Sequence, residues 1–404
     1  MKKSEEEIRS RVVGGLSMEH AITETKLLST ISEEVLSESR EDYIRLRERK
    51  QVRRNVFNSI RRLDVLQDLL EDEEITEIMV NGTNRIFIEK GGKLIETDRE
   101  FSSKDKLEEI IQQIASKGNR IVNETSPILD VRLEDGSRVN IVLPPIAIDG
   151  PVVTIRRFPK EALTMKRLIE LGAITKEAAG FLEKLVRARY NIFISGGTGA
   201  GKTTFLNILS GFIPKEERVI TIEDSAELQI QHVKNLVRLE SRNENIEGEN
   251  EVTIRELIRS ALRMRPDRVV VGEVRDEVAI DMLQAMNTGH DGSLSTGHAN
   301  SASDMLNRLE TLVLMGLDIP VTAIRGQIAS AIDIIVHLGR LRDSSRKVLE
   351  IDEVGEFRDG MIELIPLYRF QEFSEHQGKI EGELRATKHS LRNVSKCKRA
   401  GVSI

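Results

Sequence analysis

The sequence of 404 residues contains no tryptophan, and aromatic residues make up only 3% of it. Single-stranded nucleic acid is usually held by stacking its bases on aromatic side chains, so this scarcity counts against such a binding groove. The formal net charge of -6 also counts against a nucleic-acid surface. We therefore expect no nucleic-acid partner.

Cysteine is nearly absent, since Cys397 is the only one. A single thiol excludes a disulfide framework and a cysteine-rich metal site. Cys397 stands among lysines and arginines in a polar C-terminal stretch. We expect it to be an incidental exposed thiol, and we expect no structural metal.

Long apolar runs are also absent. No stretch approaches the roughly 20 apolar residues that span a bilayer, and the first ten residues, MKKSEEEIRS, lack the apolar core of a secretory signal. We expect a cytoplasmic protein. The hydrophobic share of 39% and the charged share of 31% are typical of a globular protein, and the length allows two or three domains.

The first half of the chain changes its character near residue 75. Residues 1–74 are rich in charge and helix formers and contain no proline, which predicts an α-helical N-terminal region. Residues 75–158 hold short β-rich runs separated by Asn-Gly, Gly-Gly and Asp-Gly turns, with one helix at about residues 103–116. This pattern predicts an α+β domain, which ends at a linker marked by Pro159.

Strands and helices alternate in the second half of the chain, from residue 191 to about residue 339. This alternation predicts an α/β domain with a parallel sheet covered on both faces. A run rich in Val, Ile and Leu at about residues 351–370 predicts further strands. We therefore place a second domain at residues 159–370 and expect a polar C-terminal tail at residues 371–404.

Residues 195–204, SGGTGAGKTT, match the phosphate-binding pattern G-x-x-x-x-G-K-[ST] between a predicted strand and a predicted helix. Backbone N–H groups and the helix N-terminus can then surround the β-phosphate of a nucleotide. We expect Lys202 to neutralise the β- and γ-phosphates and Thr203 to offer a hydroxyl to Mg²⁺. A ligand-free glycine turn would leave a lysine at that position without a reason. The expected residues for binding ATP and Mg²⁺ are Gly196, Gly197, Thr198, Gly199, Ala200, Gly201, Lys202, Thr203 and Thr204.

A nucleotide hydrolase also needs a carboxylate at the end of a neighbouring strand. Residues 269–273, VVVGE, form an apolar run that ends in Glu273, and residues 221–227, TIEDSAE, form another that ends in a cluster of acids. The shared strand-end position favours a functional role for Glu223 and Glu273. For Asp224, a helix N-cap is an equally good interpretation.

Two histidines, His290 and His298, lie eight residues apart in a segment rich in Gly, Ser and Thr. A zinc site is one interpretation. It lacks cysteines and a third ligand at metal spacing, so we favour a polar loop that senses the γ-phosphate.

The order of these four segments resembles the secretion ATPase superfamily, which powers type II and type IV secretion and type IV pili. Residues 78–82 (IMVNG), 130–140 (DVRLEDGSRVN), 263–268 (RMRPDR) and 294–300 (LSTGHAN) look like the CpaF-type branch, the ATPase of Tad pilus assembly. The resemblance runs from about residue 66 to residue 367.

The resemblance implies a RecA-like P-loop NTPase domain, preceded by an α+β, PAS-like domain, in a homohexameric ring. Glu223 would be the catalytic glutamate, and Glu273 would act through magnesium together with Thr203. Arginines of the N-terminal domain would reach the phosphates on closure, with Arg138 and Arg156 as the matching positions and Arg132 and Arg157 as weaker ones. Of the two histidines, His298 is the better match.

The function that we predict is ATP hydrolysis by a motor for pilus assembly, and possible retraction, of the Tad type. It would act on inner-membrane platform proteins at the cytoplasmic face of the membrane, to which it would be peripherally bound. A type IV secretion ATPase or an archaeal-type pilus motor shares all four segments. A nucleic-acid motor on the same core and a scaffold that binds nucleotide without turnover are further alternatives.

Overall fold

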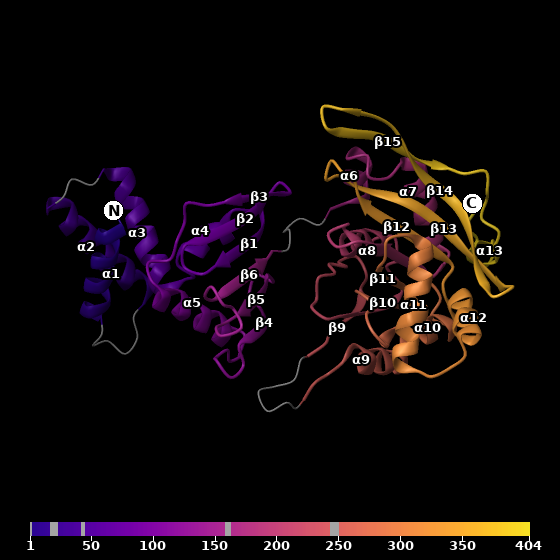
Figure 1. The fold of residues 1–404 in the computed structure, drawn as a ribbon, viewed down its shortest axis with the longest axis horizontal. Helices are drawn as coiled ribbons and strands as arrows, with labels where there is room; N and C mark the ends of the chain where they lie inside the picture. Colours follow the sequence, from indigo (N-terminus) through magenta and orange to yellow (C-terminus); the bar gives the residue numbers. More distant parts are fainter. Residues whose placement is uncertain (1, 17–22, 42–44, 158–162, 243–249) are drawn as a thin grey trace. The chain divides into compact units, whose positions relative to one another are not determined.

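The structure is a computed structural model, and it describes residues 2–16, 23–41, 45–157, 163–242 and 250–404. The chain divides into two compact units, Met1–Lys160 and Glu161–Ile404. Figure 1 draws both units. The predicted linker proline, Pro159, lies outside the described residues.

The first unit begins with helices that form a core of their own. Buried side chains recur at helical spacing, such as Val52 and Val56, and they pack against Ile8, Leu27 and Ile31 from the preceding helices. A short fourth helix leads into the sheet of this unit. The helices are α1 (Lys2–Leu16), α2 (Glu24–Glu41), α3 (Leu46–Arg61) and α4 (Val65–Glu71).

A six-stranded antiparallel sheet follows, with the strand order β3-β2-β1-β6-β5-β4. Its buried face, with Val139 and Ile141 for example, packs on the helix α5, whose N-cap is Ser103. The elements are β1 (Ile75–Asn81), β2 (Arg85–Lys90), β3 (Lys93–Glu96), α5 (Lys104–Lys117), β4 (Ile128–Arg132), β5 (Arg138–Val142) and β6 (Val152–Arg156).

The second unit is built on a nine-stranded sheet with the order β15-β14-β13-β12-β7-β11-β10-β8-β9. The six strands from β12 to β9 in this order are parallel, and β13, β14 and β15 extend the sheet in antiparallel fashion. The strands are β7 (Ile192–Gly196), β8 (Arg218–Glu223), β9 (Asn235–Glu240), β10 (Arg268–Val271), β11 (Leu294–His298), β12 (Ile334–Arg340), β13 (Arg346–Arg358), β14 (Met361–His376) and β15 (Lys379–Ala386).

Helices cover both faces of this sheet (Figure 1). Successive residues of β7 face opposite layers: Ile192 and Ile194 join the core under α7 and α8, and Phe193 joins the core under α10, α11 and α12. The helices are α6 (Met165–Glu170), α7 (Lys176–Arg187), α8 (Lys202–Ser210), α9 (Ile254–Ala261), α10 (Val278–Asn287), α11 (Ala302–Gly316), α12 (Val321–Ala331) and α13 (Ser395–Ala400), with a 3-10 turn at Leu262–Met264.

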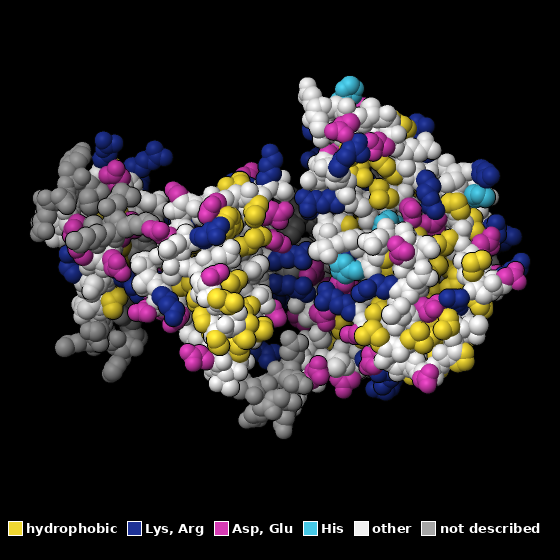
Figure 2. All heavy atoms as spheres, in the orientation of Figure 1, with side chains coloured by type: hydrophobic (Ala, Val, Ile, Leu, Met, Phe, Trp, Pro, Cys, Tyr) yellow, Lys and Arg dark blue, Asp and Glu magenta, His cyan; other side chains and the backbone are white. Residues whose placement is uncertain are grey.

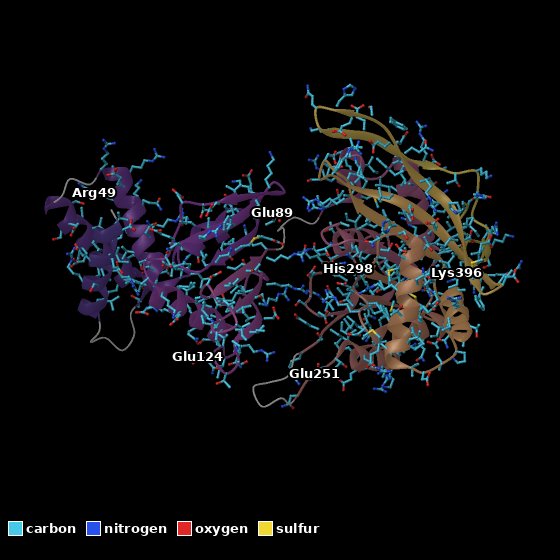
Figure 3. The ribbon with its side chains drawn as sticks, in the orientation of Figure 1. Arg49, Glu89, Glu124, Glu251, His298 and Lys396 are labelled. Atoms are coloured by element: carbon cyan, nitrogen blue, oxygen red, sulfur yellow. The ribbon has the colours of Figure 1, made fainter. Side chains whose placement is uncertain are left out.

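The prediction of a polar tail at residues 371–404 is wrong. This segment completes β14 and forms β15 and α13, and it buries Ile380 and Leu384 against the rest of the unit. Cys397, expected to be an exposed thiol, is only 3% exposed. Lys396 beside it forms ion pairs of 2.7 Å with Asp291 and 2.6 Å with Asp333, which fix α13 in place. Figure 3 labels this lysine.

The predicted fold class is confirmed: an α/β unit with a RecA-like arrangement is preceded by an α+β sheet domain and N-terminal helices. Within the described residues, none of the helices has both the length and the apolar composition that crossing a membrane requires.

Candidate active site

The candidate residues of the second unit lie at one edge of its sheet. The neighbouring strands β7, β11, β10 and β8 run parallel, so their carboxyl ends meet at that edge. β7 leads into the glycine-rich loop, β11 ends in His298, β10 leads to Glu273, and β8 ends in Glu223.

The glycine-rich loop joins β7 to α8. Gly199 and Gly201 have φ angles of 71° and 92°, a region that favours glycine. A Cβ on Gly196 would lie 2.6 Å from the carbonyl oxygen of Leu338, so only glycine fits there. Gly197 and Thr198 lie exposed at the crest of the loop. The loop therefore presents backbone N–H groups and the N-terminus of α8 in the way that phosphate binding requires.

Lys202 is the first residue of α8, and it is 7% exposed. Its Nζ donates to the carbonyl oxygen of Gly197 at 3.0 Å and lies 3.2 Å from Nδ1 of His298. Burial and the charge of Lys202 lower the pKa of His298 below 6.5, so the imidazole is neutral at pH 7. Figure 3 labels His298 near the end of β11.

Glu273 continues the same series of contacts. Its Oε1 lies 2.9 Å from Nε2 of His298, and its Oε2 accepts a hydrogen bond of 2.7 Å from Arg275. The contact with His298 has ion-pair distance but not hydrogen-bond geometry, so Oε1 is buried without a hydrogen-bond partner among the described residues. Burial alone raises the pKa of Glu273, but the hydrogen bond and charge of Arg275, together with the charge of Lys202, lower the pKa overall. The carboxylate is therefore ionised at pH 7.

The surroundings of Glu223 raise its pKa, in contrast to those of Glu273. It is 3% exposed, its Oε2 accepts hydrogen bonds of 2.8 and 2.9 Å from the N–H groups of Glu227 and Leu228, and its Oε1 has no partner within the described part of the chain. Burial raises the pKa of Glu223 from 4.5 to about 7, although the two N–H groups oppose the shift. A carboxylate with a pKa near the operating pH suits a general base.

Gly272 gives Glu223 the space that it occupies. A Cβ on Gly272 would lie 3.1 Å from Cγ of Glu223, tighter than ordinary contact. The backbone N–H of Gly272 donates to the carbonyl oxygen of Ile222, which fixes the two strand ends side by side. Gly272 precedes Glu273 in the sequence, but the space it leaves is occupied by Glu223 on the neighbouring strand.

Asp224 is not a helix N-cap, because no helix follows it in residues 225–234. Its Oδ2 lies 3.8 Å from Nη1 of Arg275, and its backbone carbonyl and Oδ1 accept from Ser241. Asp224 therefore belongs to the charged surroundings of Glu273.

Magnesium would find suitable donors near the loop. The hydroxyl of Thr203, in the first turn of α8, and the unpaired Oε1 of Glu273 are oxygen donors of the kind that Mg²⁺ prefers. Among the described residues, no three His, Cys, Asp or Glu side chains form a cluster that could hold a metal by themselves.

The two histidines do not come together. His298 ends β11, whereas His290 lies before the start of that strand, where its Nδ1 is 3.2 Å from the carbonyl oxygen of Ala285. The two rings therefore lie at opposite ends of β11, and the geometry gives no support to a zinc site that they would share.

Three of the four candidate arginines form a row on the sheet of the first unit. Arg138 on β5 pairs with Arg132 on β4 and with Arg156 on β6, so all three point to the same face. Arg132 donates from Nε to the carbonyl oxygen of Gly136 at 3.2 Å, and Nε of Arg156 lies 3.9 Å from Oε1 of Glu77. Figure 2 shows Lys and Arg side chains on both units, interspersed with Asp and Glu. The fourth, Arg157, instead donates to the backbone carbonyls of Asp72 and Ile75.

Two side chains of this edge were missed in the sequence. Arg275 binds Glu273, and its position two residues after that acid is the only signal for it. His337 on β12 lies opposite Ser195 on β7, and its Nδ1 is 2.9 Å from the Ser195 hydroxyl. The contact between His337 and Ser195 depends on the register of the two strands, so the sequence gives no signal for it.

Comparison with known proteins agrees with this geometry. A family model described as "Type II/IV secretion system protein" matches residues 61–400. A Mycobacterium tuberculosis protein named for conjugal transfer is 36% identical over 294 residues, which cover 71% of this chain and 83% of that protein. The type IV secretion system protein VirB11 of Bartonella henselae is 31% identical over 329 residues, with 72% of this chain and 91% of that protein covered.

Among solved structures, the pilus retraction motor PilT with bound ADP has a similar fold. The match has a TM-score of 0.53 at 19% identity and covers 84% of this chain and 87% of that chain. At this identity the likeness concerns the fold alone.

Replacing Gly272 with alanine should displace the Glu223 carboxylate. Because a misplacement of about 1 Å can cost roughly 10²-fold in rate, we expect kcat for ATP hydrolysis to fall about 10- to 100-fold, with ADP affinity unchanged. Gly180→Ala is the matched control, since a Cβ there meets no atom within 4 Å. Equal kcat values for the two variants would contradict the packing argument.

The raised pKa of Glu223 predicts a pH dependence. A general base works only when it is ionised, so kcat/KM should rise with pH, with its midpoint near the pKa of about 7. Carbon-13 NMR of the glutamate carboxyl groups should show one group titrating near that pH, and the Glu223→Gln variant should lose it. Persistence of that signal in the variant would assign the titration to another residue.

Proposed function

The chain belongs to the type II/IV secretion system protein family, and on that premise we propose that it is the motor ATPase of a type IV secretion or conjugal-transfer machine. It is an ATP-hydrolysing enzyme of this family. The observation that carries the site assignment is the unbroken series of contacts from Lys202 through His298 to Glu273 at one sheet edge.

The type IV secretion alternative has better support than the predicted Tad pilus function. The two sequence relatives described above are named for conjugal transfer and for type IV secretion, and the matches cover 83% and 91% of their lengths. The likeness to the pilus motor extends to the fold only. The proposal therefore replaces pilus assembly with export as the principal function.

In the proposed reaction, the loop N–H groups and Lys202 hold the β- and γ-phosphates of ATP. Oε1 of Glu223, buried and without a partner in the described structure, takes a proton from the attacking water. A bond forms between the water oxygen and the γ-phosphorus, and the bond from that phosphorus to the β,γ-bridging oxygen breaks. The products are ADP and phosphate.

Glu273 and Thr203 would hold Mg²⁺, which when bound supplies charge neutralisation at the phosphates. The depressed pKa of Glu273 keeps its carboxylate ionised for this task, while the raised pKa of Glu223 makes that residue the better proton acceptor. Environments that separate the pKa values of two carboxyl groups are the usual way to divide acid–base roles. Neutral His298 can donate a hydrogen bond to the γ-phosphate without adding a full charge.

The arginine row of Arg132, Arg138 and Arg156 would add charge stabilisation from the first unit. Arginines that reach the phosphates late favour the transition state over bound ATP. A triphosphate bound by both units would also shift the protein towards a closed form, since a ligand shifts such an equilibrium through its differential affinity. We propose that this closure, in a homohexameric ring, moves platform proteins at the cytoplasmic face of the inner membrane.

The enzymatic part of the proposal is tested with purified wild type, Lys202→Ala and Glu273→Gln. We expect hydrolysis by the wild type and a loss of at least about 10³-fold in both variants, since each removes charge stabilisation at the phosphates. Light scattering reports the oligomeric state with and without nucleotide. Hydrolysis that depends strongly on added DNA would support a nucleic-acid motor instead, and tight ATP binding without turnover would support a scaffold.

The export part is tested in cells that lack the gene. Complementation with wild type, but not with Glu273→Gln, should restore transfer of DNA or secreted protein. Restoration of surface pili with no change in transfer would return the assignment to pilus assembly.

A further inference from the structure

The side of the glycine-rich loop away from the carboxylates has its own basic residue. β7 lies between β11 and β12. Beyond β11 lie β10 and β8, whose ends carry the carboxylates, and beyond β12 lies β13. The contacts of Lys202 run towards His298 and Glu273. A nucleotide whose γ-phosphate faces those groups therefore extends its α-phosphate towards the other side, where the turn between β12 and β13 lies.

Arg346 is the first residue of β13, directly after this turn, and its side chain contacts the glycine-rich loop. Its Nε donates to the carbonyl oxygen of Gly199 at 2.8 Å, and its Cδ is 3.6 Å from the place that a Cβ on Gly201 would occupy. The side chain is exposed. Its Nη1 and Nη2 have no hydrogen-bond partner among the described residues, so the end of the guanidinium is available at the mouth of the loop.

The turn that carries Arg346 is held from several directions. Arg342 forms ion pairs with Glu372 and Glu375 on β14. Asp343 accepts from the N–H of Ile380 at 2.9 Å and from Ser345. Such anchoring places Arg346 before any ligand arrives, which lowers the entropic cost of using it.

Lys347, the next residue, anchors the turn on its other side. Its Nζ donates to the carbonyl oxygen of Gly172 at 2.8 Å, and the side chain is buried. The charged groups of Lys347 and Arg342 are therefore paired within the protein. Arg346, in contrast, makes a hydrogen bond only through its Nε.

We propose that Arg346 is a nucleotide-binding residue that donates from Nη1 and Nη2 to the α-phosphate of ATP and ADP. A guanidinium matches two phosphate oxygens with two parallel N–H groups, and the bond from Nε to Gly199 sets its direction. Arg346 thus distinguishes a nucleotide from a single phosphate ion. The inference rests on the proposed nucleotide site and adds a residue that none of the four sequence segments contains.

Calorimetric titration of Arg346→Ala with Mg²⁺-ADP and with inorganic phosphate tests the proposal. A single phosphate can bind at the glycine-rich loop but has no second phosphate group for Arg346 to contact. ADP affinity should fall about tenfold, the size expected for loss of one charge-assisted contact, and phosphate affinity should stay unchanged. Arg358→Ala is the control, since it removes a cation from the far end of β13, where it is paired with Glu356.

Equal losses for ADP and inorganic phosphate would show that Arg346 only shapes the loop, and would overturn the inference. Unchanged ADP affinity in Arg346→Ala would overturn it as well, while leaving the nucleotide site itself intact. If the wild type bound neither ligand, the nucleotide site would fail and the inference with it. An equal ADP loss in Arg358→Ala would assign the effect to the loss of any positive charge on β13, and would also overturn the inference.

Discussion

The site depends on the parallel pairing of β7, β11, β10 and β8, which brings four carboxyl ends to one edge of a sheet. Each strand end contributes one element: the glycine-rich loop, His298, Glu273 and Glu223. Strands in a sheet lie about 4.8 Å apart, so these four strand ends span roughly 15 Å. The two helical layers bury the sheet on both faces and keep the register of the four ends fixed.

Charge balance explains why this edge is stable before any ligand binds. Lys202, Glu273 and Arg275 alternate in sign, with neutral His298 between the first two. Buried charges are costly unless they are paired, and this alternation supplies the pairing. Glu223 stands apart from the series and is stabilised by backbone N–H groups.

The sequence alone predicts the parts of this site that are local in the chain. The spacing of Gly196, Gly201 and Lys202 defines the loop, and a carboxylate after an apolar run identifies Glu273. Contacts made through strand register, such as the arginine row, or through a distant turn, such as Arg346 on Gly199, leave no local pattern. The C-terminal segment was misjudged for the same reason, because Leu384 and Cys397 find apolar neighbours only once the sheet has formed.

The central proposal is that Glu223 accepts a proton from the water that attacks the γ-phosphate. Single-turnover hydrolysis by the Glu223→Gln variant tests it most directly, with ADP affinity measured alongside. We predict that the hydrolysis rate falls by about 10²- to 10⁴-fold, the usual contribution of a general base, while ADP affinity is unchanged. A wild-type hydrolysis rate in Glu223→Gln would contradict the proposal.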